Sequence, residues 1–514
     1  PKSGPAIVVA NHPFGGIEGI ILCAMLKSVR PDVKLMANYM LQRIPDMRDL
    51  FIFVDPFGGS GAKRINVKPM KESLQWLKDG GVLGIFPSGE VSHLHLSRGG
   101  ISDPEWSETV AKLVRRTRVP VVPVYFEGTN SALFQVLGLM HPRVRTAMLP
   151  HEVMNKQRKT IDVRVGNPIP FERLEPLDDD KALMNYLRVR TYNLRNRPGD
   201  GSRRHTFTFP VRLPRHEPPP VVQAVSPDQL EAEVMRLPAD QVLIEQGPHT
   251  VAWTTADQSP AVLRELGRLR EITFRKVGEG TGKDCDLDEF DPYYLHLFVW
   301  HRAKRELVGA YRLGETDKIV ESRGLSGLYT STLFRYRMQL LDRMGPALEM
   351  GRSFVREEYQ RSFSALLLLW KGLGLYVCRN PKYKILFGPV SINNEYQTSS
   401  RLLLVAFLKV TNFLPDLARL VKARKPMRTN PLNVLRLRKT HAIVDSLDEV
   451  ESLIADIESD LKGVPILLKQ YLKLGGKLLG FNIDPDFGNV LDGLILVDLT
   501  QTDRAILVKY MGRE

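Results

Sequence analysis

A histidine and a glutamate near the start of the chain are the first residues spaced for chemistry. The apolar segment 6–10 predicts a buried strand that ends just before His12, and Gly15 and Gly16 permit a tight turn before a helix that carries Glu18. A carboxylate on one imidazole nitrogen fixes the tautomer and leaves the other nitrogen free to take a proton from a hydroxyl. The pair therefore predicts a general base, with a purely structural pair as the alternative.

Two later segments fit the same chemistry. The sequence FPSGE at 86–90 follows an apolar strand, and VPVVPVYFEG at 119–128 is a second strand with prolines at its start and middle. With His12, these segments resemble the ordered blocks of the glycerophosphate and lysophospholipid acyltransferase family, over residues 1–175. The resemblance implies acyl transfer from a thioester to a hydroxyl, with His12 as general base and Glu18 as the residue that orients it.

The chain departs from that family at two places. Five residues separate His12 from Glu18, whereas the family has four between its histidine and an aspartate. The middle block, where the resemblance implies acceptor binding, reads Ser88, Gly89 and Glu90. Val91 then stands where the family has an arginine, whose permanently charged fork suits phosphate. We therefore expect an acceptor without a phosphate, and Arg64 or Lys63 is the alternative source of the missing charge.

Composition limits the class of protein. The 514 residues suffice for two or three domains, and 43% hydrophobic with 25% charged residues is usual for a folded protein. The formal charge of +14 predicts an acidic partner, but neither a nucleic-acid module nor a continuous basic helix is recognisable, so nucleic acid is not expected. No apolar run reaches the length of about 18 residues that suggests a spanning helix. No signal peptide is expected, although the chain is expected to continue upstream of Pro1.

The cysteines and histidines show no metal or disulfide pattern. Cys23, Cys285 and Cys378 lie far apart, which favours a reducing compartment. His93 and His95 have the spacing of one strand face but lack a third ligand, so we expect them in a loop near the site. The segment FGGSGAKR at 57–64 lacks the spacing of a phosphate loop and is expected to be an ordinary loop. No metal or cofactor is predicted.

Residues 1–175 alternate short apolar segments with helical ones, which predicts an α/β domain with a parallel or mixed sheet. The expected strands are 6–10, 34–37, 51–54, 81–86, 119–126 and 160–165. The expected helices are 69–78 and 104–116, each with a proline suited to its first turn. Residues 197–227 are rich in proline and arginine and cannot build a core, so they mark the best domain boundary.

A second set of elements follows this stretch. The expected order is strand 242–246, helix 260–275, acidic loop 284–291, strands 293–301 and 306–313, a helical stretch 331–344, strand 347–355 and helix 363–378. The order resembles the Gcn5-related N-acyltransferase (GNAT) superfamily, in the branch of acyl-homoserine-lactone synthases and ornithine-lipid N-acyltransferases. The residues that carry the resemblance are Arg270 and Phe274, Asp288 and Asp291, Arg312 with Leu313, and Glu349 with Arg352. Residues 464–499 resemble the closing segment of the ornithine-lipid branch.

The resemblance implies a substrate site made of these residues, with Arg270 and Phe274 on its first helix. An amine must lose a proton as it attacks a thioester, and Glu349 is the candidate to accept that proton. Asp288 and Asp291 would hold the ammonium groups of an amino acid. Arg312 or Arg352 would take its carboxylate. The alternatives are an internal Glu349–Arg352 ion pair and a solvated acidic loop.

Residues 401–439 stand apart in composition. Apolar side chains crowd 402–413, and basic ones follow over 422–439. This pattern suits an anionic membrane surface or an acidic acyl carrier protein, whereas a core helix followed by a solvated loop is the alternative.

The order of the two domains resembles the bifunctional ornithine-lipid synthases. We expect an O-acyltransferase domain at 1–196, a linker at 197–238 and a GNAT-like domain at 239–514, both domains being α/β. The resemblance implies 3-hydroxyacyl transfer from acyl carrier protein, or CoA, to an amino acid, then O-acylation of the lyso-aminolipid by a cytoplasmic protein at the inner face of the membrane. The head group stays open between ornithine, glycine and lysine, with the paired aspartates favouring a diamino acid. The alternatives are a lysophospholipid acyltransferase with an accessory domain and a haemolysin-like membrane-binding protein.

Overall fold

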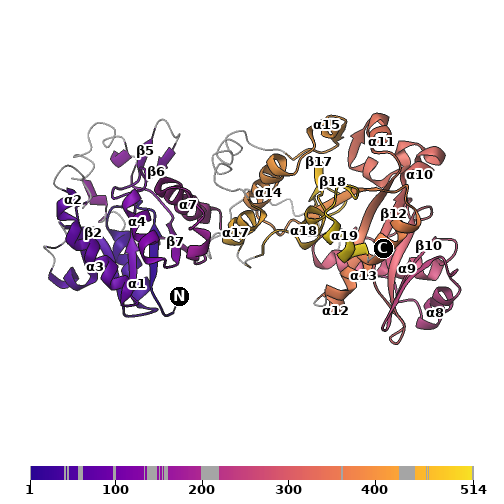
Figure 1. Ribbon diagram of the computed structural model, residues 1–514, viewed down its shortest axis with the longest axis horizontal. Coiled ribbons are helices and arrows are strands. Elements are labelled where there is room, and N and C mark those ends of the chain that lie inside the picture. Colours follow the sequence, from indigo (N-terminus) through magenta and orange to yellow (C-terminus); the bar gives the residue numbers. More distant parts are fainter. Residues whose placement is uncertain are drawn as a thin grey trace. The chain divides into compact units, whose positions relative to one another are not determined.

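The computed structural model describes residues 2–39, 42, 45–55, 62–95, 100–131, 133–135, 148–149, 151–152, 154, 160–197, 219–360, 363–427, 446–458, 460 and 462–511. The chain forms two compact units (Figure 1). Unit 1 comprises Pro1–Phe207 with Lys439–Gly463, and unit 2 comprises Thr208–Arg438 with Val464–Glu514. Each unit contains a sheet covered by helices, which confirms the α/β class expected from the sequence.

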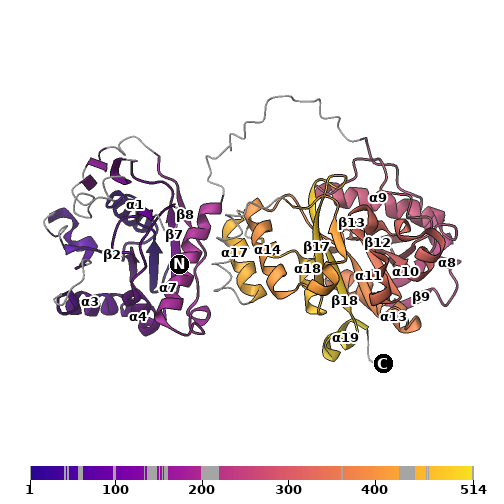
Figure 2. The same cartoon turned by 90° about the horizontal axis from the view of Figure 1, so that it is seen from above.

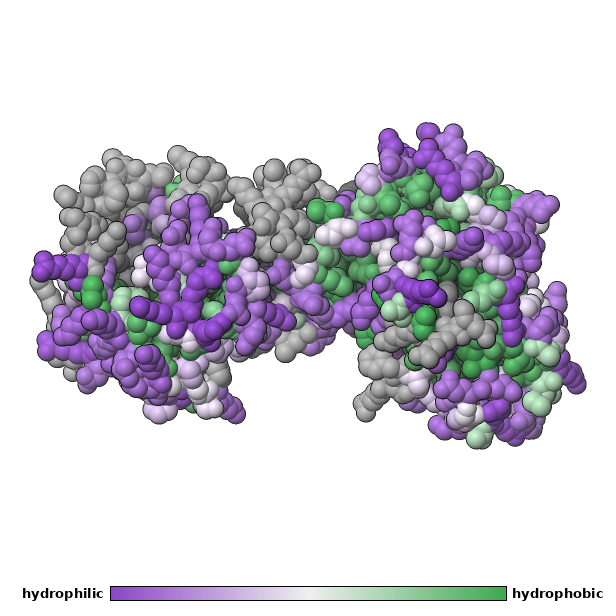
Figure 3. Space-filling view, viewed as in Figure 1, coloured by the Kyte–Doolittle hydropathy of each residue, from purple (hydrophilic) through white to green (hydrophobic). Residues whose placement is uncertain are grey.

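The surface of both units is largely hydrophilic in the view of Figure 3, and hydrophobic side chains show in places on unit 2. None of the helices within the described ranges is both long and apolar enough to cross a membrane.

The sheet of unit 1 has β1 at its centre. Its strands are β1 (Ala6–Ala10), β2 (Val33–Asn38), β3 (Phe51–Val54), β4 (Val82–Ile85), β7 (Val121–Phe126) and β8 (Val163–Val165), in the order β3-β2-β4-β1-β7-β8. These are the six strands expected from the sequence, and all pair in parallel except β8. The carboxyl ends of β1, β4 and β7 therefore lie side by side at one edge, where open α/β sheets bind their ligands.

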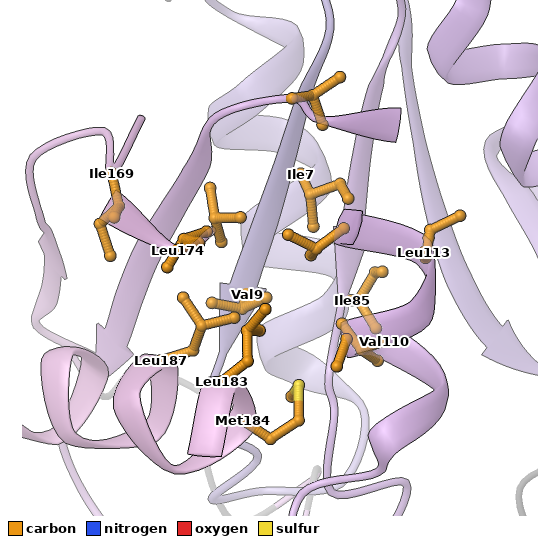
Figure 4. Close-up of a cluster of buried hydrophobic side chains, with 14 of the residues drawn as sticks. Ile7, Val9, Ile85, Val110, Leu113, Ile169, Leu174, Leu183, Met184 and Leu187 are labelled. Carbon is orange, nitrogen blue, oxygen red and sulfur yellow. The ribbon is translucent and has the colours of Figure 1, made fainter. Parts of the chain in front are cut away.

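Helices cover both faces of this sheet. They are α1 (Ile17–Lys27), α2 (Ala62–Ile65), α3 (Val67–Lys78), α4 (Glu108–Thr117) and α7 (Asp180–Asn193). Because successive strand residues point to opposite faces, Ile7 and Val9 pack against α4 and α7 (Figure 4), whereas Val8 packs with Leu22 of α1. Helix α4 begins four residues later than expected, because Ser107 caps it by accepting a hydrogen bond from the backbone of Thr109.

One helix of unit 1 comes from far along the chain. Helix α17 (Leu447–Ile457) packs against α7 and the short helix η5 (Leu194–Asn196). Figure 1 and Figure 2 both draw α17 beside α7. The sequence placed all of 239–514 in one domain, whereas residues 439–463 belong to unit 1.

The sheet of unit 2 is mostly antiparallel. Its strands are β9 (Val242–Gln246), β10 (His249–Thr254), β11 (Leu295–His301), β12 (Glu306–Glu315), β14 (Ala347–Val355), β15 (Ile385–Ile392), β17 (Lys477–Asp484) and β18 (Val490–Asp498), in the order β17-β18-β15-β14-β12-β11-β10-β9. Strands β14 and β15 are the parallel pair, in register only from Ala347 to Glu349. Beyond Glu349 these two strands no longer pair with each other.

Two long helices lie on opposite faces of this sheet (Figure 2): α9 (Pro260–Lys276) and α13 (Phe363–Arg379). Ala310 of β12 belongs to the same buried cluster as residues of α9. The next residue, Tyr311, faces the other way and contacts Trp370 of α13 at 6.1 Å between ring centroids. The site residues of β12 and β14 lie on the α9 face, as the contacts below show.

Several elements of unit 2 differ from the expected ones. Residues 227–235 of the expected linker form helix α8 (Pro227–Met235), which packs on α9 and has Ser226 as its N-cap. The expected helix at 331–344 divides into η7 (Tyr329–Thr332), β13 (Phe334–Tyr336) and α11 (Met338–Met344). The remaining α-helices and strands are β5 (His93–His95) and β6 (Gly100–Ser102) in unit 1, and α10 (Thr316–Arg323), α12 (Glu357–Gln360), α14 (Thr398–Thr411), α15 (Pro415–Ala418), β16 (Val421–Ala423), α18 (Ile466–Lys473) and α19 (Arg504–Met511) in unit 2.

Candidate active sites

The structure brings His12 and Glu18 together at the carboxyl end of β1. Nδ1 of His12 lies 2.7 Å from Oε1 of Glu18, and Nε2 has no hydrogen-bond partner within the described part of the chain. Glu18 is fully buried, whereas 17% of the His12 side chain is exposed. The imidazole can therefore meet a substrate while the carboxylate stays out of water.

The turn before α1 keeps Glu18 ionised. Its carboxylate accepts backbone hydrogen bonds from Phe14 at 2.9 Å, Gly15 at 2.8 Å and Gly16 at 2.9 Å. Burial alone would raise the pKa of Glu18, but His12 and the N–H groups of Gly15 and Gly16 lower it to about 2. Burial likewise lowers the pKa of His12, yet the charge and hydrogen bond of Glu18 outweigh burial and raise that pKa above its ordinary value. The five-residue spacing is thus accommodated, with Gly15 at φ +91°.

A third carboxylate fixes the backbone of His12. Oδ1 of Asp103 accepts a hydrogen bond from the His12 N–H at 3.1 Å and another from the Ser92 hydroxyl at 2.5 Å. Oδ2 accepts from the indole N–H of Trp106 at 3.0 Å. The sequence did not point to Asp103, because it belongs to neither expected block and reaches His12 only through the fold.

The middle block lies beside the histidine. Phe86 stacks near the imidazole at 4.8 Å between ring centroids. The Ser88 hydroxyl donates to the carbonyl of Glu90 at 2.8 Å, and Gly89, at φ +64°, and Glu90 are exposed. Val91 is buried, and a Cβ added at Gly15 would come 2.8 Å from its Cγ2.

The basic residues proposed as substitutes for the arginine lie at α2. Arg64 is exposed and makes no hydrogen bond or ion pair with His12 or Glu18. Residues 57–61 of the glycine-rich segment lie outside the described residues. His93 is in β5, where its Nδ1 lies 3.1 Å from the carbonyl of Val91, so it occupies a short hairpin strand beside the block.

In unit 2, Glu349 sits at the point where β14 and β15 stop pairing. It is 1% exposed, and its carboxylate accepts backbone hydrogen bonds from Thr330 at 2.6 Å and Tyr329 at 3.0 Å and a hydroxyl hydrogen bond from Tyr294. Burial raises its pKa although the hydrogen bonds of Thr330 and Tyr294 lower it. A buried carboxylate with a raised pKa has the properties of a general base.

Glu349 and Arg352 do not form the internal ion pair considered from the sequence. Nε of Arg352 lies 3.1 Å from Asp286, Nη2 lies 3.3 Å from Asp288, and Nη1 donates to the Tyr329 hydroxyl at 3.1 Å. Strand residues three apart normally point to opposite faces, but Arg352 has φ +47° at an irregularity where Gly351 pairs with Arg312 and Phe354 with Ala310. The irregularity turns Arg352 toward the face that holds Glu349.

The two aspartates of the acidic loop, Asp288 and Asp291, already form ion pairs with arginines of the same unit. Asp291 accepts from Arg270 at 2.7 Å and from the N–H of Asp288 at 2.8 Å, and Asp288 pairs with Arg312 at 2.6 Å. Asp291 is buried, so it braces the site, whereas 18% of the Asp288 side chain is exposed. Nη2 of Arg312 is buried without a hydrogen-bond partner in the described chain, as expected of a donor that awaits an anion.

The helix α9 contributes support. Arg270 is fully buried between Asp291 and His296, whose Nδ1 lies 3.3 Å from Nη2 of the arginine. Phe274 lies in the core against Phe487, at 5.2 Å between ring centroids, and Phe487 in turn lies under Arg352 at 4.8 Å. Phe274 therefore supports the candidate site indirectly, by packing against the ring of Phe487 that contacts Arg352.

A further group of carboxyls near Arg352 was not expected. Burial, with the charge of Glu395, raises the pKa of Glu279 to about 7. Burial, with the charges of Asp484 and Glu279, raises the pKa of Asp492 to about 8, and burial also raises that of Asp484. Arg352 is the cation whose charge acts on Asp484 and Asp492.

The apolar run at 402–413 belongs to the core. It lies mainly on α14, where Leu403, Leu404, Val405, Phe407 and Leu408 are buried. Val410 is 69% exposed. Most of the apolar side chains that were expected to contact a membrane or a carrier protein are thus buried in the core. The basic residues at 428–439 lie outside the described residues.

Two family descriptions match the chain. Residues 2–201 match "Acyltransferase", and residues 269–371 match "Acetyltransferase (GNAT) domain". The fold and both sites thus define an acyltransferase with two α/β units.

Relatives also match the two parts of the chain separately, as N-acyltransferases and as O-acyltransferases. The glycine N(alpha)-acyltransferase of Bacteroides thetaiotaomicron is 31% identical over 56% of this chain and 88% of the relative. The chain therefore belongs to the N(alpha)-acyltransferase family of that relative and is an acyltransferase. The lyso-glycine lipid O-acyltransferase of Phocaeicola vulgatus is 27% identical over 38% of this chain and 70% of the relative, and the L-ornithine N(alpha)-acyltransferase of Rhodobacter capsulatus is 29% identical over 46% and 85%.

Among solved structures, the 1-acyl-sn-glycerophosphate acyltransferase PlsC of Thermotoga maritima matches with a TM-score of 0.23 at 18% identity, covering 37% of this chain. The chain spans 64% of the length of that protein. The acyl-homoserine-lactone synthase LasI matches with a TM-score of 0.28 at 11% identity, covering 52% of this chain and 98% of LasI.

Proposed function

We propose that the chain makes an aminolipid by two successive acyl transfers. Unit 2 transfers a 3-hydroxyacyl group to the amine of an amino acid, and unit 1 acylates the hydroxyl of the resulting lyso-lipid. The observation that carries the proposal is that each unit has its own base candidate, His12 with Glu18 in unit 1 and Glu349 in unit 2. The relatives named for N-acylation and for lyso-lipid O-acylation support the same pairing of reactions.

In unit 2, the amine nitrogen attacks the thioester carbonyl carbon and the carbon–sulfur bond breaks. Glu349 accepts the amine proton, directly or through a water, and the proton passes on to the leaving thiolate. The raised pKa of Glu349 favours this role because it makes the carboxylate a stronger base. Arg312 binds the carboxylate of the amino acid with its free Nη2, and Asp288 faces the amine.

In unit 1, the hydroxyl oxygen attacks a second thioester. Nε2 of His12 takes the hydroxyl proton and returns it to the departing thiolate. Glu18 does not take this proton, because its pKa of about 2 keeps it ionised, but its charge stabilises the imidazolium that forms. Asp103 keeps the ring in place through the His12 backbone.

The acceptor of unit 1 lacks a phosphate in this proposal. A phosphate is best held by arginine, and the position in question is occupied by buried Val91. Glu90 is exposed next to it and suits a cationic head group. A lyso-aminolipid has both properties.

We propose ornithine as the head group. Asp286, Asp288 and Asp291 are matched by three arginines, one of which, Arg352, is also the cation whose charge acts on Asp484 and Asp492. A second ammonium group on the amino acid would compensate this excess of carboxyls. Glycine has no such group, although the relatives include glycine acyltransferases.

The donors are thioesters of acyl carrier protein, with CoA thioesters as the alternative. The chain has a net charge of +14, which suits both the acidic carrier and an anionic membrane surface. We therefore place the enzyme in the cytoplasm, peripherally bound to the inner face of the membrane.

The test is lipid mass spectrometry in a bacterial host that lacks aminolipids. The intact chain should yield a diacylated aminolipid whose mass identifies the head group. His12→Ala should replace it with the monoacyl form, and Glu349→Ala should abolish both, whereas the exposed control Glu108→Ala should leave the product unchanged. An altered lysophospholipid pool without an aminolipid would refute the proposal.

A further inference from the structure

Helix α17 carries a fully buried charge into unit 1. Asp456 of α17 pairs with Arg190 of α7, with Oδ2 at 2.7 Å from Nε and 2.6 Å from Nη2. Arg190 is 1% exposed and Asp456 is 0% exposed. An ion pair removed from water in this way is costly unless both partners are present, so α7 requires α17.

Further side chains around this ion pair donate hydrogen bonds to α17. Asn167 donates to Oδ1 of Asp456 from its backbone at 3.4 Å and from its side chain at 3.3 Å. Arg197 donates to the carbonyl of Asp456 at 2.6 Å, and Asn193 donates to the carbonyl of Leu453 at 2.9 Å. These contacts come from the segment between β8 and the short helix η4 (Phe171–Arg173) and from α7–η5, so two segments of unit 1 recognise the helix.

The helix also has the apolar pattern of a docking element. Val450, Leu453, Ile454 and Ile457 are all buried and follow the i, i+3, i+4, i+7 spacing of one helix face. Ser446 caps the helix by accepting a hydrogen bond from the backbone of Glu449. Helix α17 contacts both α7 and η5, so its buried apolar face lies against unit 1.

Helix α7 also reaches the histidine site from its other side. The Tyr192 hydroxyl accepts from the N–H of Asp103 at 2.8 Å, and Arg188 donates to the carbonyl of Asp103 at 2.9 Å. Asp103 in turn holds the N–H of His12. The same helix therefore contacts α17 through Arg190 and the His12 loop through Asp103.

We infer that residues 446–458 are an intramolecular docking helix that binds the α7–η5 face and completes unit 1. The region up to Phe207 is then an incomplete domain, and the segment that completes it is made after most of unit 2. The inference does not rest on the proposed reactions, since its first readout is association.

The experiment uses the full chain with a protease site inserted between Asp200 and Gly201 and an affinity tag on the amino-terminal piece. After cleavage, the two pieces should stay together in size-exclusion chromatography. Excess synthetic peptide of residues 446–458 should displace the carboxyl-terminal piece, and the same peptide with Asp456→Ala should compete about 100-fold less well. Separation of the cut wild-type pieces without peptide, or equal competition by both peptides, would overturn the inference.

Variants of the uncut chain give a second readout. Asp456→Asn should lower kcat of the unit 1 reaction more than it changes KM and leave N-acylation intact, because α7 no longer holds Asp103 firmly. Asp448→Asn is the matched control, since Asp448 is an exposed acid on the same helix. Unchanged kcat in Asp456→Asn, or an equal loss in both reactions, would overturn the link between α17 and the histidine site.

Discussion

Replacing Glu18 with glutamine tests the histidine site most directly. The substitution keeps the size of the side chain but removes its charge. The amide oxygen can still accept from Phe14 and Gly15, whereas the amide nitrogen cannot accept from Gly16. The variant therefore removes the charge beside His12 together with the one hydrogen bond from Gly16.

The pKa shift of Glu18 gives the size of the expected loss of stability. A fall from 4.5 to about 2 corresponds to about 3 kcal/mol in favour of the ionised carboxylate in the folded protein. Because the folded pKa is the lower one, this stabilisation is present above about pH 4.5 and is lost as the pH falls toward 2. At neutral pH we expect Glu18→Gln to lose about 3 kcal/mol of stability at most and to reduce kcat for O-acylation on the order of 100-fold.

The pH dependence of O-acylation is the decisive assay. His12 must be neutral to accept a proton, so the acid limb of kcat follows its pKa, which Glu18 raises. In Glu18→Gln the burial that lowers this pKa remains and the charge that raises it is gone. The acid limb should therefore move to lower pH while the plateau rate falls.

The control is Glu108→Gln, another glutamate in the first turn of a helix, which is exposed on α4. It should leave the rate and the pH profile unchanged. An acid limb at the same pH in Glu18→Gln and wild type, with kcat within about threefold, would refute the assigned role of Glu18.

Three further predictions concern unit 2. Glu349→Gln should lower N-acylation about 100-fold and leave O-acylation of supplied lyso-lipid intact, as separate product assays would show; a parallel loss of both would contradict the division of labour. Arg352→Ala should cost about 3–5 kcal/mol in urea unfolding, because it leaves buried Asp286 without its ion-pair partner. Arg305→Ala, at another left-handed but more exposed arginine, should leave the urea midpoint close to that of the wild type, and an equal loss in both variants would contradict the prediction. Burial, with the charge of Arg270, lowers the pKa of His296 to about 4. Up to about 3 kcal/mol of stability should therefore be lost as the pH falls from about 6.5 to 4. His296→Asn should flatten this dependence of stability on pH, and an unchanged slope would contradict the prediction.

Much of the fold could be predicted from local patterns. The six strands of unit 1 are short apolar segments bounded by turn residues, and periodicity alone locates them. Helix α8 was missed because the surrounding proline-rich composition outweighed its cap, Ser226 followed by Pro227. The split of 331–344 into a strand and a helix depends on β16 pairing with β13, which no local pattern reveals.

The candidate sites could be predicted where the residues that act together are close in the sequence. His12 and Glu18 are joined by a single turn, so their spacing was informative. Asp103 reaches His12 only through the fold, and nothing in its sequence neighbourhood marks it. Tyr294 follows the marked acidic loop, but its hydrogen bond to Glu349 depends on how the strands pack. Arg352 was expected at the site, but its partners depend on an αL residue in a strand, which no pattern of side-chain types encodes.

The position of α17 in the sequence has a consequence for how the protein is made. Domains generally fold as they emerge from the ribosome, the first one first. Here the residues up to Phe207 emerge early but must wait for Lys439–Gly463, so all of Thr208–Arg438 is synthesised before unit 1 can close. Until then the face of α7 with Arg190 is open to water and to chaperones, and a ribosome stalled before Ser446 would release a chain whose first unit is unfinished.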